Sequence, residues 1–502
     1  MIHPPPSLTE GPRNIVQLVP VITGPGGERS TDLFTEPLLH STPENQPEVR
    51  WGANLTDSGN AYFFASRHSA TLRYCHTSGR WLVWDRRRWW PDENESVIRL
   101  AKQTLQDMYQ ATLRIPDLDL RKRVIAHLLR SEAEKRLRSM ISLAKSEPAI
   151  AVTAKDLDRD PMLLNCQNGT INLATGVLQA HRREDLITKL VPVEYLPEAK
   201  SPVFEAFLSR AMANNGDLIR YLQRAIGYAL TASIVEEAIF FLFGPGANGK
   251  TTFLEAIRKI LGDYAGQVPI ETLMKKQSDA GIPNDIAMLN GWRFVTSSET
   301  EEGHKLASSK IKYLTSNAPI QARFLHREFF RFLPSHKIFM DTNHKPEVRG
   351  DDDGIWRRIK TIPFTVTVPR AERDPELGEK LARELPGILA WAVRGCLDWH
   401  EQGLAEPKDV SLATSAYRGE MDTGAIFLLE CCELGLGFQE PTRDLYRAYL
   451  GWCDETGEQP ISTKAFGAML TRQEGVTQGR DAQSRHWKGV RIKPTADGSA
   501  TE

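Results

Sequence analysis

Apolar residues recur every three or four positions over long parts of this chain, which predicts helices. The spacing is most regular in 95–145, in VFEAFLSRAM (203–212) and in LIRYLQRAIGYAL (218–230). LYRAYLGWCDETGEQPISTKAFGAMLTR (445–472) predicts a helix, a turn and a second helix. Most of the ordered chain is therefore expected to be helical.

Short apolar runs between these helices predict strands. AIFFLF (238–243) ends at a glycine, whereas the strands predicted within 291–303 and 336–348 end at acidic and amide side chains. LLNCQNGTINLATGVLQA (163–180) contains Asn-Gly and Thr-Gly pairs, which are typical of tight turns between short strands. WLVWDRRRWW (81–90) predicts a hairpin. Together the pattern predicts an α/β fold.

Composition excludes several classes of protein. The 502 residues carry a net charge of −1, so any contact with nucleic acid must come from local patches. No apolar run reaches the length of a membrane span, and the N-terminal residues lack the apolar core of a signal peptide. The six cysteines show no Cys-x-x-Cys spacing, which argues against a zinc site or disulfide framework. We expect no membrane association and a reducing cytoplasm, that of a bacterial host.

The stretch after the strand at 238–243 has the spacing of a phosphate-binding loop. Gly244 is followed after four residues by Gly249, Lys250 and Thr251, and a helix is expected from Lys250 onward. Loop amides and a helix start attract phosphates, Lys250 would reach the β- and γ-phosphates, and Thr251 would bind Mg²⁺. The expected nucleotide contacts are Gly244, Pro245, Gly246, Ala247, Asn248, Gly249, Lys250, Thr251 and Thr252. An ordinary glycine-rich turn is the alternative.

Three further features follow along the chain. Glu299, with Glu301 as second choice, could lie near the metal and the attacking water, and Asn343 could contact the γ-phosphate. Arg357 and Arg358 follow a short acidic run and could contact a neighbouring subunit's nucleotide. Taken singly, these residues could equally be an acidic turn, a turn asparagine and surface ion pairs.

The order of these features resembles the superfamily three helicases of small DNA viruses, phages and plasmids, which are AAA+ ring ATPases. The nearest likeness is to the phage and plasmid primase–helicase family that includes the poxvirus primase-helicase. It rests on FVTSSETEEG, IKYLT, ARFLHRE, KIFMDTNHKPEV and DDDGIWRRI, with LLNCQNGTINLATG ahead of them, and covers about 55–490. One departure is Ser316-Asn317-Ala318, where the family often has Gly-Gly-Asp.

The resemblance implies a P-loop AAA+ core with ATP and Mg²⁺ as its ligands. Lys250 and Thr251 would be Walker A residues, Glu299 the Walker B acid that joins Thr251 at the metal, and Asn343 the sensor amide. Arg358 is the preferred arginine finger and Arg357 the second choice. The implied domains are a disordered tail (1–48), an α+β region (49–150), a helicase-preceding domain (151–235), the ATPase (236–368), a helical lid (369–425), a winged-helix-like domain (426–495) and a tail (496–502).

Two regions are candidate DNA contacts. The family forms a hairpin in the ring channel from the segment that here carries His326 and Arg327, with Arg323 and Lys312 adding charge, unless these are ordinary surface residues. Near the C-terminus, Ser462 could cap a helix that carries Lys464. Arg485, Lys488 and Arg491 would then line a wing that binds duplex DNA or docks a protein.

Two other patches have a structural reading that we favour. The tryptophans of the 81–90 hairpin would pack inside the protein, and the basic residues in 121–138 would form a solvated helix face.

The expected function is an ATP-driven hexameric replicative DNA helicase of a phage, plasmid or integrated element, without its own primase domain. A separate primase or polymerase would be a partner. The alternative is a nucleotide-switched protein that binds an origin or assembles a replication complex without processive unwinding.

Overall fold

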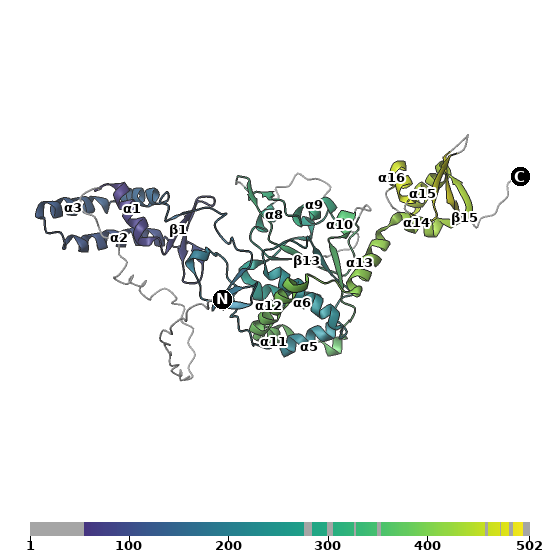
Figure 1. The fold of residues 1–502 in the computed structure, drawn as a ribbon, viewed down its shortest axis with the longest axis horizontal. Helices are drawn as coiled ribbons and strands as arrows, with labels where there is room; N and C mark the ends of the chain where they lie inside the picture. The colour runs from purple at the N-terminus through teal and green to yellow at the C-terminus, as the bar shows by residue number, and fades with distance from the viewer. Residues whose placement is uncertain are drawn as a thin grey trace, which may run out of the picture. The chain divides into compact units, whose positions relative to one another are not determined.

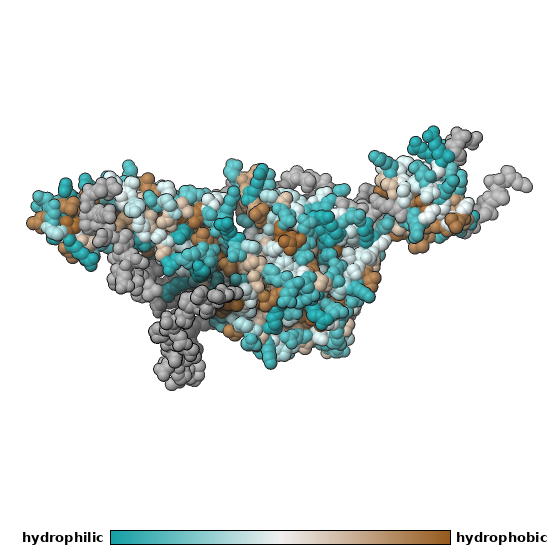
Figure 2. Space-filling model, in the orientation of Figure 1, coloured by the Kyte–Doolittle hydropathy of each residue, from teal (hydrophilic) through white to brown (hydrophobic). Residues whose placement is uncertain are grey.

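The computed structural model describes residues 55–275, 284–298, 305–325, 328–348, 353–456, 460–471, 473–480 and 485–494 (Figure 1). The tails predicted at 1–48 and 496–502 lie outside the described residues, and so do Glu299, His326 and Arg327. Within the described ranges no helix is long and apolar enough to cross a membrane. On the face drawn in Figure 2, hydrophobic residues form small patches separated by hydrophilic ones.

The first described part packs helices against a small sheet of order β3-β2-β1-β4. Its helices are α1 (Asp57–His68), α2 (Ser96–Thr112), α3 (Leu118–Ser131) and α4 (Glu134–Ala144), and its strands are β1 (Leu72–Cys75), β2 (Arg80–Trp84), β3 (Trp89–Pro91) and β4 (Ala151–Val152). The hairpin predicted at 81–90 is confirmed, because β2 and β3 pair across a turn closed by Asp85. Trp89 is fully buried and Trp90 lies under the Arg88 guanidinium, so the packing interpretation holds for Trp89.

The next part confirms the short strands and helices predicted in 163–230. β5 (Leu163–Cys166), β6 (Gly169–Asn172) and β7 (Val177–Gln179) form an antiparallel sheet, followed by α5 (Pro202–Ala211) and α6 (Gly216–Leu230). Asn165 joins several segments here: its side-chain nitrogen donates to the carbonyls of Arg87 (2.9 Å) and Lys189 (3.0 Å). Its main-chain amide donates to the hydroxyl of Tyr264, at 3.3 Å. This buried amide therefore connects the 81–90 hairpin to the central part of the chain.

The central sheet is parallel throughout its described strands and runs in the order β14-β8-β13-β10-β9. The strands are β8 (Ile239–Phe243), β9 (Ala265–Gln267), β10 (Phe294–Ser298), β13 (Lys337–Thr342) and β14 (Ile359–Pro363). Successive residues enter two separate cores: Phe240 and Leu242 pack in one, and Ile239 and Phe241 in the other. A strand buried on both faces needs an uninterrupted apolar run, which explains why AIFFLF does not alternate with polar residues.

The other elements of the central part surround this sheet. They are α7 (Lys250–Leu261), α8 (Asn284–Met288), α9 (Ser308–Leu314), the hairpin strands β11 (Ile320–Ala322) and β12 (Phe330–Phe332), α10 (Asp353–Trp356), α11 (Leu377–Arg383), α12 (Leu385–Gln402) and α13 (Lys408–Met421). Short 3-10 turns occupy Arg183–Asp185, Gly262–Tyr264, Ile270–Thr272 and Arg370–Glu372. Figure 1 shows α6 and α12 side by side on one side of the sheet, where the residues of both helices share one core.

Buried cations hold the amino-terminal edge of this sheet. Arg293, just before β10, donates to the carbonyls of Leu230 (2.6 Å) and Leu163 (2.8 Å). Lys337, the first residue of β13, donates to the carbonyls of Thr231, Ser233 (3.2 Å) and Ser335 (2.9 Å). The first two of these carbonyls follow the end of α6, where helix carbonyls lack helical partners. The two strands that end near the acidic and amide side chains are thus fixed to α6 at their starts.

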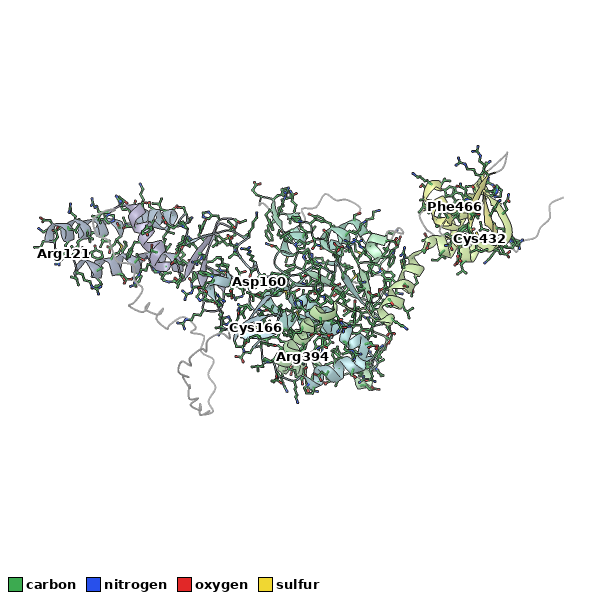
Figure 3. The ribbon with its side chains drawn as sticks, viewed as in Figure 1. Arg121, Asp160, Cys166, Arg394, Cys432 and Phe466 are labelled. Carbon is green, nitrogen blue, oxygen red and sulfur yellow. The ribbon has the colours of Figure 1, made fainter. Side chains whose placement is uncertain are left out.

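The C-terminal part has the element order α14 (Thr423–Cys431), β15 (Cys432–Pro441), α15 (Thr442–Thr456), α16 (Thr463–Thr471), β16 (Thr477–Arg480) and β17 (Arg485–Ile492). Its strands pair as β15-β17-β16, around a core that includes Cys432 and Phe466, labelled in Figure 3. The predicted helix pair and final strand are confirmed, and the Ser462 hydroxyl accepts from the Ala465 amide at 3.3 Å. β15 was not predicted: its register shifts between Leu434 and Gln439, which interrupts the alternating pattern of a strand.

Candidate functional site

The loop between β8 and α7 has a backbone that accommodates glycine at two positions. Gly249 has φ +89°, and a Cβ there would lie 2.7 Å from the Phe207 ring. A Cβ on Gly244 would lie 2.0 Å from the carbonyl oxygen of Phe364. That same carbonyl accepts a hydrogen bond from the side chain of Asn248, at 3.0 Å. The loop is therefore tied closely to the segment after β14, and the spacing read from the sequence has a structural cause.

Lys250 is buried at the start of α7 and points back into this loop. Its ammonium donates to the carbonyl of Gly244 (2.7 Å) and to the side-chain oxygens of Asn248 (3.0 Å) and Asn343 (2.9 Å). Burial lowers the pKa of Lys250, and the nearby Asp341 carboxylate opposes that shift. The predicted lysine and the predicted amide, 93 residues apart in sequence, thus meet in space.

Asp341 also belongs to this group and was not predicted from the sequence. Its Oδ2 accepts from the Thr251 hydroxyl at 2.5 Å, and its Oδ1 lies 3.8 Å from the Lys250 ammonium. A signal was present in the pattern: Asp341 and Asn343 are two residues apart near the end of a strand, and such residues point to the same side. Sequence reasoning considered only the residue after the strand.

These side chains line a cavity of about 360 Å³ at the carboxyl edge of the central sheet. Its described lining consists of residues 246–252 together with Ser298, Asp341 and Asn343. Gly244 contributes its carbonyl to Lys250, and Pro245 is not part of the lining. Glu299 lies outside the described residues, but Ser298 just before it lines the cavity.

The two arginines after the acidic run differ in exposure. Arg358 is 6% exposed, and its guanidinium donates to the Thr315 hydroxyl (3.1 Å), the Gly354 carbonyl (2.7 Å) and the Glu237 carboxylate (2.6 Å). The side chain of Arg357 is 67% exposed and lies 3.3 Å from the same Glu237 carboxylate. For a contact outside the chain this geometry favours Arg357, the reverse of the order of preference read from the sequence.

The predicted hairpin forms between β11 and β12, which pair from Ile320 with Phe332 to Ala322 with Phe330. The Arg323 guanidinium lies over the ring of the exposed Phe329, 4.7 Å from its centre. Lys312 lies on α9 and is half-buried. His326 and Arg327 are outside the described residues, so the contact of this hairpin with DNA stays a prediction.

The predicted basic residues of the C-terminal part lie on its surface. Lys464 is exposed on α16, and Arg485 and Lys488 are exposed on β17. Arg491 is also exposed but pairs with the Glu433 carboxylate, its Nε at 2.7 Å. Lys464 and Lys488 therefore keep the positions that a DNA contact requires, whereas Arg491 has a partner within the chain.

Comparisons with known proteins match two segments of the chain. A family described as "D5 N terminal like" matches residues 61–213, and a family of unknown function (DUF5906) matches residues 242–358. The second match begins within β8 and ends at the arginine pair, so it contains the whole cavity lining.

Curated viral proteins are also similar to the chain. The chain is 26% identical over 296 residues to "Putative helicase L207/L206" of Acanthamoeba polyphaga mimivirus, which covers 55% of this chain and 31% of that protein. It is 26% identical over 420 residues to "Putative helicase 022R" of Frog virus 3, with 67% and 43% covered. "Putative primase C962R" of African swine fever virus is 28% identical over 214 residues, with 41% and 22% covered. The chain thus spans less than half the length of these relatives.

Proposed function

We propose that this chain, which belongs to the D5-like primase–helicase family, is an ATP-dependent replicative DNA helicase that works as a hexameric ring. The observation that carries the proposal is the convergence of Lys250, Thr251 and Asn343 on one polar cavity at the carboxyl edge of a parallel sheet. Ligands of open α/β sheets bind at that edge. The names of the viral relatives support a helicase-like role in replication.

Each residue has a task that follows from its chemistry. The loop amides and the start of α7 would hold phosphate oxygens, and the Lys250 ammonium would turn from its amide partners to the β- and γ-phosphates. Mg²⁺ would supply positive charge between these phosphates. The oxygen donor of Thr251 suits such a hard cation. Asn343 would contact the γ-phosphate, and Glu299 would orient the attacking water.

A ring arrangement would give Arg357 or Arg358 access to a neighbouring subunit's nucleotide. The exposed guanidinium of Arg357 supports it for this role, whereas Arg358 would first have to leave Glu237. DNA in the ring channel would meet the β11–β12 hairpin through Arg323, His326, Arg327 and Lys312, which supply phosphate contacts.

The test measures phosphate release with and without single-stranded DNA. Wild-type protein is expected to hydrolyse ATP faster when DNA is present. Glu299→Gln is expected to bind a fluorescent ATP analogue normally yet to hydrolyse ATP at least about 100-fold more slowly, because a general base contributes a factor of that order. Glu301→Gln is the matched control and is expected to remain active. If Glu301→Gln is the inactive variant, Glu301 is the acid; if DNA never stimulates hydrolysis, the helicase proposal fails.

A second candidate function rests on the C-terminal part. Its element order, with β15-β17-β16 pairing and exposed Lys464 and Lys488, supports a winged-helix module that binds duplex DNA. The chain could then be a nucleotide-switched origin-binding or assembly protein. Electron micrographs with DNA and a nonhydrolysable ATP analogue, together with a strand-unwinding assay, separate the two: rings that unwind duplexes support the helicase, and duplex binding without unwinding supports the switch.

A further inference from the structure

Asp341 occupies a position in the cavity that the roles proposed above leave unexplained. Its side chain is 12% exposed and lies near the end of β13. In the parallel register, Asp341 is paired with Leu242 of β8 on one side and with Ser298 of β10 on the other. The carboxylate therefore lies between the strand that leads into the phosphate loop and the strand that leads to Glu299.

The carboxylate contacts both residues expected to meet a bound nucleotide. Thr251 donates its hydroxyl proton to Oδ2 at 2.5 Å, and the Lys250 ammonium is 3.8 Å from Oδ1. Among the described residues that line the cavity, Asp341 carries the carboxylate and Lys250 the ammonium.

A carboxylate at this place would repel a polyphosphate if nothing lay between them. Two like charges about 4 Å apart cost several kcal/mol in partly buried surroundings. A divalent cation between them reverses the sign of the interaction. The oxygens of Asp341 and Thr251, 2.5 Å apart, offer the hard oxygen ligands that Mg²⁺ takes from proteins, which usually supply one or two carboxylates and leave the remaining positions to water and phosphate.

We propose that Asp341 holds the divalent cation of the nucleotide complex, directly or through a metal-bound water, together with Thr251. The inference rests on the proposed nucleotide site. In the arrangement described here, the Thr251 hydroxyl donates to Asp341; with the metal in place, the hydroxyl oxygen would instead face the cation while Asp341 retains its position on β13.

Binding of a fluorescent ATP analogue, measured with EDTA and then with Mg²⁺, tests this role. Asp341→Asn is expected to bind the metal-free analogue as tightly as wild type or more tightly, because the repulsion is gone. The gain in affinity that Mg²⁺ supplies is expected to fall by about 10- to 100-fold, the usual effect of weakening a metal site. Glu255→Gln, an exposed carboxylate on α7, is the matched control and is expected to behave as wild type.

A second variant distinguishes metal binding from a merely structural role. Asp341→Cys is expected to lose affinity for the Mg²⁺ complex and to regain it with Cd²⁺, which prefers a thiolate, while wild type gains nothing from the exchange. Thermal unfolding of each variant checks that it is folded. If Asp341→Asn keeps the full Mg²⁺-dependent gain, or if Cd²⁺ restores nothing to folded Asp341→Cys, the inference is wrong and the proposed function survives. If wild type binds no analogue under either condition, both are wrong.

Discussion

Two lysines are buried at opposite edges of the central sheet. Lys250 follows the carboxyl end of β8 and is 3% exposed, and Lys337 begins β13 at the amino-terminal edge and is 1% exposed. Among the described residues, each ammonium donates to three oxygens. Burial lowers the pKa of both side chains. By residue type, burial and charge the two positions are alike.

Their acceptors differ. Lys337 donates to main-chain carbonyls, which the surrounding backbone holds in place. Two of the acceptors of Lys250 are the side-chain amides of Asn248 and Asn343, which can rotate, and a cavity lies beside them. A phosphate could replace those amides without disturbing the fold. Exchangeable partners next to open space, and not the burial of a cation, therefore distinguish a candidate site from a structural contact.

The largest expected effect is on hydrolysis. Lys250→Met removes the ammonium that would meet the β- and γ-phosphates, and ATP hydrolysis is expected to fall at least about 100-fold, the cost of losing one strong electrostatic contact to the reacting group. Phosphate release and thermal unfolding measured on the same sample check this. The comparison breaks if Lys250→Met hydrolyses ATP normally, or if Lys337→Met with unchanged stability loses activity to the same extent.

The arginine pair offers the same contrast between exposed and enclosed cations. Arg357→Ala is expected to lower hydrolysis by about 10³-fold, as loss of an arginine finger does, with little change in nucleotide binding. Arg358→Ala is expected instead to lower the free energy of unfolding by about 2 kcal/mol, because Glu237 loses its buried partner.

Mixed rings test whether the arginine acts between subunits. Arg357→Ala and Lys250→Met subunits are each expected to be inactive and to recover part of the hydrolysis when combined. Recovery from Arg358→Ala mixtures but not from Arg357→Ala mixtures would restore the preference read from the sequence.

Stability should respond in the opposite way at the two lysines. Lys337→Met leaves buried carbonyls without a donor and is expected to lower the free energy of unfolding by about 2 kcal/mol. Lys250→Met is expected to cost less than half as much, because its former acceptors border a cavity that water can enter. Urea unfolding of the two variants and wild type gives both values. Equal losses would mean that the cavity edge is as rigid as the opposite edge.

The smallest effect concerns pH. Burial, with Arg293 nearby, holds the pKa of Lys337 well below its ordinary 10.5 in the folded chain. Between that lowered pKa and 10.5 the unfolded chain binds more protons, so this lysine makes the free energy of unfolding rise with pH. Lys337→Met removes that contribution, and the gap between wild type and variant is expected to widen with pH by less than about 1.4 kcal/mol per pH unit. Urea unfolding between about pH 7 and 9 measures it; parallel curves would mean that Lys337 titrates alike in both states.

Local patterns in the sequence were enough to predict most elements that build the candidate site. The apolar run at 238–243, the spacing from Gly244 to Thr251 and the strand that ends beside Asn343 all formed as expected, and so did the C-terminal helix pair and last strand. These features depend on contacts within a few residues: hydrophobic periodicity, the conformational freedom of glycine, and helix capping at Ser462. Neighbouring residues carry such signals, so a single sequence contains them.

Tertiary structure alone decided which of these residues meet and which are enclosed. Asp341 became part of the cavity because β13 pairs directly with β8, a contact between segments about 100 residues apart in sequence. Arg358 rather than Arg357 was buried because Glu237 and Thr315 approach it from other segments. Strand pairing and burial depend on the free energy of the whole packed core, in which distant residues exclude water together. A sequence pattern can therefore predict a phosphate loop, but not which carboxylate or which arginine faces it.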